Sequence, residues 1–145
     1  MSFIATVPVE FPCPKHVVYE ALCDLSRYTS WTSGMTSVSY SGRMHVGLEY
    51  NTTTKVLGRV NQAKVRVAEM APDEAIVLVS NSGLITYRAA FQLRFISAES
   101  CSVICNLRFQ FSKLVIHLAQ PVIESMAEDR IRGDLETLRE HLAKH

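Results

Sequence analysis

Apolar side chains occupy every second position along two neighbouring stretches of the chain. In residues 87–95 the alternating residues include Tyr87 and Phe91, and in residues 101–111 they include Cys105 and Phe109. Such alternation places one face of a strand against a core and the other face in solvent. The sequence SAES between the two stretches predicts a turn. The two stretches therefore predict an antiparallel hairpin that must be covered on one side.

The same period of two recurs in shorter stretches separated by turn signals. Residues 2–11 alternate until the PCP sequence at 12–14, where proline cannot donate to a sheet ladder. Further short alternating or β-branched stretches are separated by turn residues at 41–42, 57–62, 71–74 and 81–83. Strands joined by short turns form an antiparallel meander. We expect about six or seven strands in one sheet.

The last part of the chain changes to helical spacing. From about Pro121 to about Ala143, apolar residues recur at steps of three and four. This pattern predicts one amphipathic helix of about six turns, at ~3.6 residues per turn. Between the first strand and the meander, residues 14–25 and then the stretch through about Trp31 predict two short helices. The expected fold class is α+β, with a curved antiparallel sheet around the long C-terminal helix.

The stretch VEFPCPKHVVYEALCDLSRYTSWTSGMTSVSYSGRMHVGLEY, residues 9–50, resembles the START-like (SRPBCC, helix-grip) superfamily. It is most similar to the polyketide cyclase/dehydrase and lipid-transport family. The matching residues are Val18, Tyr19, Ala21 and Leu22 in the first helix, then Asp24, Tyr28 and Trp31, then Val46 and Gly47 before a strand. The resemblance covers residues 1–145 and implies a single START-like ligand-binding domain with the helix-grip fold.

Composition and charge exclude several classes of function. The formal net charge is +1, and the 15 Lys and Arg residues are spread along the chain, which argues against a nucleic-acid partner. No apolar run is long enough to predict a transmembrane segment, and the N-terminal sequence does not read as a secretory signal. We therefore expect a cytoplasmic protein. We expect no cofactor and no metal, and all four cysteines as free thiols (Cys13, Cys23, Cys101 and Cys105).

The covered face of the sheet and the facing side of the helix carry the candidate site. Strand positions on that face are Tyr40, Tyr50, Thr52, Thr54, Tyr87, Phe91, Cys105, Leu107 and Phe109, and Val122, Ser125 and Met126 are expected opposite them. We predict an internal hydrophobic cavity whose ligand-binding residues are Trp31, Tyr50, Tyr87, Phe91, Phe109, Val122 and Met126. The alternative for each of these residues is simple core packing.

Three functions fit this sequence. The first is binding or carrying of a hydrophobic small molecule, such as a lipid, a polyketide or a hydroxylated aromatic. The second, implied by the resemblance, is a polyketide cyclase/dehydratase-like enzyme that uses cavity hydroxyls, with no catalytic residue assigned. The third is a protein-interaction module, and a homodimer stays open. The charged residues around Arg130 predict a solvated helix surface, whereas His117 stands close to the helix start.

Overall fold

The structure is a computed structural model that describes residues 2–56, 58–112 and 118–143. The chain begins with strand β1 (Phe3–Phe11), helix α1 (Lys15–Cys23), the 3-10 turn η1 (Leu25–Arg27) and helix α2 (Tyr28–Trp31). Six strands follow, which are β2 (Met35–Ser39), β3 (Glu49–Val56), β4 (Arg59–Ala71), β5 (Ala75–Ser80), β6 (Ile85–Ser97) and β7 (Ser100–Phe111). Helix α3 (Gln120–Ala143) comes last.

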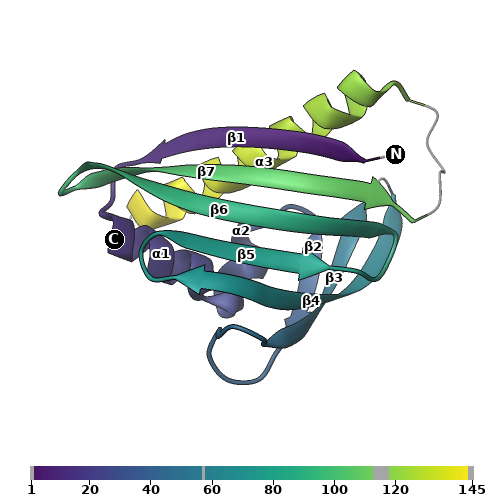
Figure 1. Cartoon of the computed structure of the whole chain (residues 1–145), viewed down its shortest axis with the longest axis horizontal. Coiled ribbons are helices and arrows are strands. Elements are labelled where there is room, and N and C mark those ends of the chain that lie inside the picture. The colour runs from purple at the N-terminus through teal and green to yellow at the C-terminus, as the bar shows by residue number, and fades with distance from the viewer. Residues whose placement is uncertain (1, 57, 113–117, 144–145) are drawn as a thin grey trace.

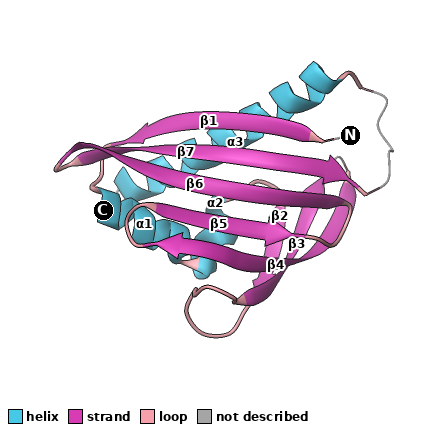
Figure 2. Cartoon of the chain, viewed as in Figure 1, coloured by secondary structure: helices cyan, strands magenta, loops and turns pink. Residues whose placement is uncertain are grey.

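The strands form one antiparallel sheet of seven strands in the order β1-β7-β6-β5-β4-β3-β2. The sheet curls, so that β2 and β3 run at a steep angle to the other strands (Figure 1). The helices lie on the concave side of the sheet, which faces away from the viewer in this figure. The same layering of helices against strands is clear in Figure 2. The α+β helix-grip architecture expected from the sequence is therefore confirmed, including the two short helices after the first strand.

Strand register follows the alternation of the sequence. In the β6–β7 pair, Tyr87 lies opposite Phe109 and Phe91 lies opposite Cys105. These four side chains share the concave face, because residues in register on antiparallel strands point to the same side. Phe95 has the same parity but is 68% exposed, since it lies beyond Gln92, where the pairing of β6 with β5 ends. The β6–β7 hairpin projects past β5 at this end of the sheet (Figure 1).

Helix α3 crosses the concave face and also protects the edge strand β1. Its buried residues are Ile123, Leu135, Leu138 and Leu142, which recur at helical spacing on one side. A side-chain oxygen of Glu124 accepts a hydrogen bond from the backbone N–H of Ile4, at 2.7 Å. Unpaired strand edges invite pairing with other chains, so this contact satisfies a group that the sheet leaves free.

The hydrophobic core is divided into two clusters. The larger cluster joins α1, α2 and the C-terminal half of α3 to the sheet. The smaller cluster contains Phe3, Phe109 and Ile123, and Phe3 stacks on Phe109 with ring centroids 5.2 Å apart. Tyr87 packs against both clusters. A core split in this way leaves room between its two parts.

Several smaller expectations can be compared with the structure. All four cysteines are free thiols, as expected. Tyr40, which we expected on the concave face, instead follows the end of β2 and is 42% exposed. His117 lies outside the described residues. No helix in the described ranges combines the length and apolarity needed to span a membrane.

Candidate functional site

A pocket of about 330 Å³ lies between α3 and the concave face of the sheet. Its walls come from α2, from strands β2 to β7 and from one side of α3, with Leu118 just before that helix. Most of the lining side chains are apolar. Leu118 and Met126 line the pocket although each is nearly half exposed, so the open side of the pocket lies near the start of α3.

Of the seven residues predicted to bind a ligand in the cavity, the structure places six at the pocket and one outside its lining. Six of them line the pocket, namely Trp31, Tyr50, Tyr87, Phe91, Phe109 and Met126. Val122 is 46% exposed and is not among the described residues that line it. On α3 the inward stripe passes through Ile123 and Ala127, so Val122 lies at the edge of the stripe. Met126 lies at the same edge, but its longer side chain reaches the pocket.

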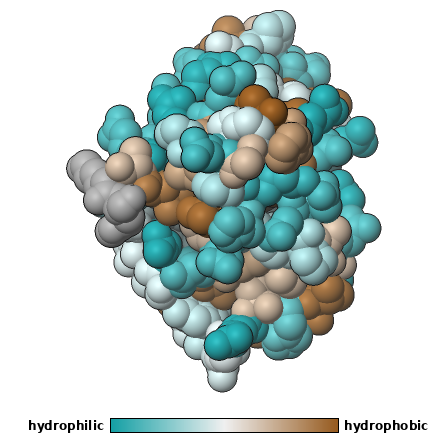
Figure 3. Space-filling model, turned by 90° about the vertical axis from the view of Figure 1, so that its left-hand side faces the viewer, coloured by the Kyte–Doolittle hydropathy of each residue, from teal (hydrophilic) through white to brown (hydrophobic). Residues whose placement is uncertain are grey.

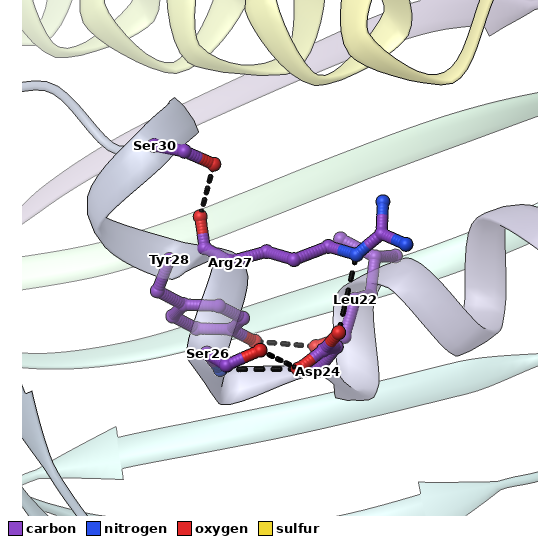
Figure 4. A network of polar contacts seen from close by, with 6 residues as sticks. All are labelled: Leu22, Asp24, Ser26, Arg27, Tyr28 and Ser30. Atoms are coloured by element: carbon purple, nitrogen blue, oxygen red, sulfur yellow. Dashed lines mark hydrogen bonds and ion pairs between the residues drawn. The ribbon is translucent and has the colours of Figure 1, made fainter. Parts of the chain in front are cut away.

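The end of α1 and the η1 turn hold Tyr28 in place. Asp24 accepts hydrogen bonds from the backbone N–H of Ser26 at 3.1 Å and from Nε of Arg27 at 3.1 Å (Figure 4). Hydrogen bonding to Ser26, with a further contribution from Arg27, keeps the pKa of Asp24 below its usual value. The phenol of Tyr28 donates to the carbonyl of Leu22 at 2.5 Å. Asp24 is therefore the N-cap of the η1 turn.

Trp31 is fixed against Tyr28 at the pocket wall. The two rings pack edge to face, with centroids 5.2 Å apart and an angle of 66° between planes. Trp31 is only 6% exposed, and its indole Nε1 is buried with no hydrogen-bond partner among the described residues. Since that nitrogen is fully covered, Trp31 presents its apolar ring to the pocket. Trp31 therefore belongs both to the larger core cluster and to the pocket lining.

Three tyrosine phenols line the pocket, and all three are neutral at physiological pH. Burial raises the pKa of Tyr87 to about 12. Burial also raises the pKa of Tyr50 and of Tyr28, and the neighbouring phenols raise each of them further. Tyr50 is 2% exposed, and its hydroxyl is not among the fully buried atoms that lack a partner, so it is accessible from the pocket that Tyr50 lines. The phenols therefore supply neutral donors and acceptors in an apolar setting.

A row of polar side chains follows the other side of the pocket. Thr52 and Thr54 lie on β3, two positions apart and facing inward, and are 6% and 9% exposed. Asn61 on β4 is the register partner of Thr54 and is 6% exposed. All three line the pocket. The alternation of β3 predicted the threonines, whereas Asn61 carries no signal that separates it from an ordinary turn asparagine.

Asp134 and Arg130 of α3 also line the pocket, and sequence reasoning missed this role for both. Asp134 accepts a hydrogen bond from the backbone N–H of Ser33 at 3.0 Å, and Arg130 donates to the carbonyl of the same residue. Burial raises the pKa of Asp134, although Ser33 and Arg130 oppose this shift. Burial, together with the nearby Asp134, raises the pKa of Cys105 to about 12, so that thiol is protonated.

Within the described ranges, no group of three or more His, Cys, Asp or Glu side chains is arranged to hold a metal ion. The pocket therefore offers a mainly apolar surface, several neutral hydrogen-bonding groups, the carboxyl group of Asp134 and the guanidinium group of Arg130. This combination suits an uncharged organic molecule better than an ion.

Comparison with solved structures identifies the fold. A START superfamily protein from Mycobacterium smegmatis superposes with a TM-score of 0.83 over 97% of this chain and 97% of that chain, at 12% identity. The chain has the START-like, helix-grip fold. The Zhui aromatase/cyclase from Streptomyces sp. R1128 shares this START-like fold, with a TM-score of 0.83, 15% identity and coverage of 99% and 95%. So does a conserved protein from Geobacillus kaustophilus, with a TM-score of 0.82, 14% identity and coverage of 99% and 96%. No protein-family model matches the sequence, and no curated protein matches it either.

Proposed function

We propose that this chain binds or carries a hydrophobic small molecule, such as a lipid, a polyketide or a hydroxylated aromatic, in the pocket between α3 and the sheet. The observation that carries this proposal is the pocket itself, which is lined by residues of both core clusters. Protein interiors normally pack with few voids larger than a water molecule. A space of about 330 Å³ inside a small domain therefore favours occupation by a ligand.

The size and chemistry of the pocket agree with this proposal. Small-molecule sites have volumes of roughly 300–1,000 Å³ and are lined mainly by apolar side chains with a few polar groups. The central strands of the sheet contribute an apolar surface to the pocket, formed by Leu78, Ala89 and Leu107. On the opposite side, α3 contributes Ile123 and Leu135. A ligand with a flat or branched hydrocarbon body fits such walls.

The proposal can be tested with the neutral fluorescent probe N-phenyl-1-naphthylamine. Trp31 is the only tryptophan of the chain and lines the pocket, so energy transfer from Trp31 to the probe reports binding at this site. Ala89 faces the pocket, whereas its neighbour Ala90 has the opposite strand parity and faces away. Ala89→Phe fills the pocket, and Ala90→Phe is the matched control.

We expect saturable binding with one probe per chain for the wild-type protein and for Ala90→Phe. Ala89→Phe should bind at least 10-fold more weakly while keeping its circular dichroism spectrum, because the added ring occupies the ligand space. The proposal is overturned if the wild-type protein shows no energy transfer at any probe concentration. It is also overturned if folded Ala89→Phe binds as tightly as Ala90→Phe.

A second candidate is a polyketide cyclase/dehydratase-like activity, and one observation favours it. A carboxyl group with a raised pKa, that of Asp134, lines the same pocket as the hydroxyls of Tyr50 and Tyr87. Groups of this kind can exchange protons with a bound carbonyl compound. One solved structure of the same fold is named as an aromatase/cyclase. A test substrate is an ortho-hydroxyaryl β-diketone, whose phenol oxygen adds to the distal carbonyl and closes a pyranone ring with release of that carbonyl oxygen as water. Mass-spectrometric detection of this water loss, present with the wild type and absent with Asp134→Asn, would support this candidate.

The protein-interaction alternative has less support. Figure 3 shows one end of the molecule, where hydrophobic side chains form several separate patches between hydrophilic ones. Interaction surfaces are usually marked by large contiguous apolar patches. Location in the cytoplasm, a homodimeric state and the absence of a cofactor stay predictions.

A further inference from the structure

The two sides of the pocket differ in chemistry. Strands β6 and β7, near one edge of the sheet, contribute Ile85, Leu107, Phe109 and Phe111 to the lining. The Phe109 and Phe111 rings meet edge to face, with centroids 6.0 Å apart, and thus form an aromatic wall. Strands β3 and β4, near the other edge, contribute the polar row of Thr52, Thr54 and Asn61. A ligand in this pocket therefore meets an apolar wall on one side and hydrogen-bonding groups on the other.

The orientation of the Asn61 amide is fixed by the chain itself. Its Oδ1 accepts a hydrogen bond from the backbone N–H of Leu84 at 2.8 Å. Because a backbone N–H is a donor, the atom that meets it must be the amide oxygen. The Nδ2 group is left as a donor, and it is not among the fully buried side-chain atoms that lack a partner, so it is accessible from the pocket that Asn61 lines. The amide therefore has two N–H groups available at the pocket.

The hydroxyls of Thr52 and Thr54 are in a similar state. Both side chains are at least nine-tenths buried, and neither hydroxyl is hydrogen-bonded to a described residue. Valine has nearly the same shape and is at least as favourable in strands. The buried polar side-chain atoms that lack a partner among the described residues are the Tyr19 hydroxyl and the Trp31 Nε1, so both threonine hydroxyls are accessible from the pocket. In a closed core each hydroxyl would be unpaired, which is unfavourable for folding. Polar residues that break a local rule in this way are typical of functional sites.

The charges around the pocket disfavour an anionic ligand. The polar row itself carries no formal charge. Across the pocket, the Arg130 guanidinium is hydrogen-bonded to the carbonyl of Ser33, and the Asp134 carboxyl group lies one helical turn further along α3. Because Arg130 and Asp134 line the pocket with opposite formal charges, the lining offers a carboxylate ligand no net positive charge to replace the hydration it would lose.

We infer that the ligand is a neutral amphipathic molecule. Its apolar body lies on the aromatic wall of Phe109 and Phe111, and a hydroxyl or carbonyl oxygen is hydrogen-bonded to Thr52, Thr54 and Asn61. This inference rests on the proposed binding function and adds to it the class of ligand and the direction in which it lies. A hydroxyl oxygen accepts from the Asn61 amide while its proton is donated to a threonine oxygen.

Three probes with one scaffold test this inference, namely naphthalene, 2-naphthol and 2-naphthoate. Their dissociation constants are measured by displacement of N-phenyl-1-naphthylamine from the wild-type protein and from two variants. The double variant Thr52→Val/Thr54→Val removes both hydroxyls of the polar row and keeps the side-chain shape. Thr53→Val is the matched control, because Thr53 lies between them on the opposite face of β3.

For the wild type we expect 2-naphthol to bind most tightly and 2-naphthoate most weakly. The preference for 2-naphthol over naphthalene should fall by roughly 2- to 10-fold in the double variant, which is the range expected for loss of one neutral hydrogen bond. The affinity for naphthalene should stay the same or rise in that variant. Thr53→Val should keep the wild-type preference.

The inference is wrong if the double variant keeps the full preference for 2-naphthol, or if 2-naphthoate binds most tightly to the wild type. Either result leaves the proposed binding function intact, because the probes still bind. If neither the fluorescent probe nor any naphthalene derivative binds to the wild type, the binding function itself is refuted and this inference falls with it.

Discussion

Tyr50 combines deep burial with a hydroxyl that has no partner among the described residues. A packed core would place phenylalanine at this position, because an unpaired buried hydroxyl lowers stability. The phenol is therefore better explained by its position at the pocket than by its contribution to folding.

For Tyr50→Phe we expect a free energy of unfolding equal to that of the wild type or up to about 1 kcal/mol higher. The measurement is urea denaturation of the two purified proteins. Phe11 on β1 is a comparison, because it is a buried aromatic residue outside the pocket lining and has no hydroxyl. A loss of more than about 1 kcal/mol in Tyr50→Phe would show that the hydroxyl has a stabilising partner and would contradict this explanation.

Asp134 should make the free energy of unfolding depend on pH, and the sign of this dependence follows from the burial of its carboxyl group. Its pKa is raised in the folded protein, so between the unfolded-state pKa and the folded-state pKa only the folded state holds the proton. The free energy of unfolding therefore falls as pH rises between these two pKa values. Asp134→Asn removes this effect and keeps an oxygen that can accept from Ser33. We expect the variant to be more stable than the wild type at pH 7, with the difference disappearing toward pH 3. Equal stability at both pH values in urea denaturation would contradict the assignment.

Sequence reasoning could predict side chains such as Tyr50, Thr52 and Phe109, because strand parity alone decides which face they occupy. It could not predict Asp134 or Arg130, because charged helix residues usually lie in solvent and only the packing angle of α3 turns these two toward the pocket. Val122 is 46% exposed because the inward stripe of α3 passes through Ile123 and Ala127, and spacing alone cannot fix the rotation of the helix.

At the scale of elements, the strands and the long helix were predictable because their periodicities are strong and uninterrupted. The stretch before β3 was less so. Val46 has the parity of the covered face, yet it is 57% exposed and lies before the first residue of β3, whereas Leu48 and Tyr50 are buried. The turn between β5 and β6 supports the site, because it places the backbone N–H of Leu84 where it donates to Oδ1 of Asn61.

Gly83 in that turn should be more sensitive to substitution than Gly58 in the turn between β3 and β4. Both have positive φ, 90° and 78°, so alanine is strained at either position. A Cβ at Gly83 would also collide with Oδ1 of Asn61, whereas a Cβ at Gly58 meets no atom within 4 Å. We expect Gly83→Ala to lower the free energy of unfolding by about 1–3 kcal/mol and by more than Gly58→Ala. Equal losses in urea denaturation would show that Asn61 is not held in this way.

At the scale of the whole molecule, the curl of the sheet around α3 decides that a pocket exists. The sequence predicted the sheet, the helix and a cavity between them. It could not give the volume of about 330 Å³, which depends on where α3 crosses the sheet and on the side chains of α2.

Nuclear Overhauser effects between a bound neutral probe and the methyl groups of the protein test the central claim most directly. With N-phenyl-1-naphthylamine bound, we expect contacts from the probe protons to the methyl groups of Ala89, Leu107 and Ile123, which line the pocket. The outward methyl groups of Ala90 and Ile104 should give none, because they lie on the other face of the same strands. Contacts to Ala90 and Ile104 in place of the pocket methyl groups would contradict the claim that this pocket binds the ligand.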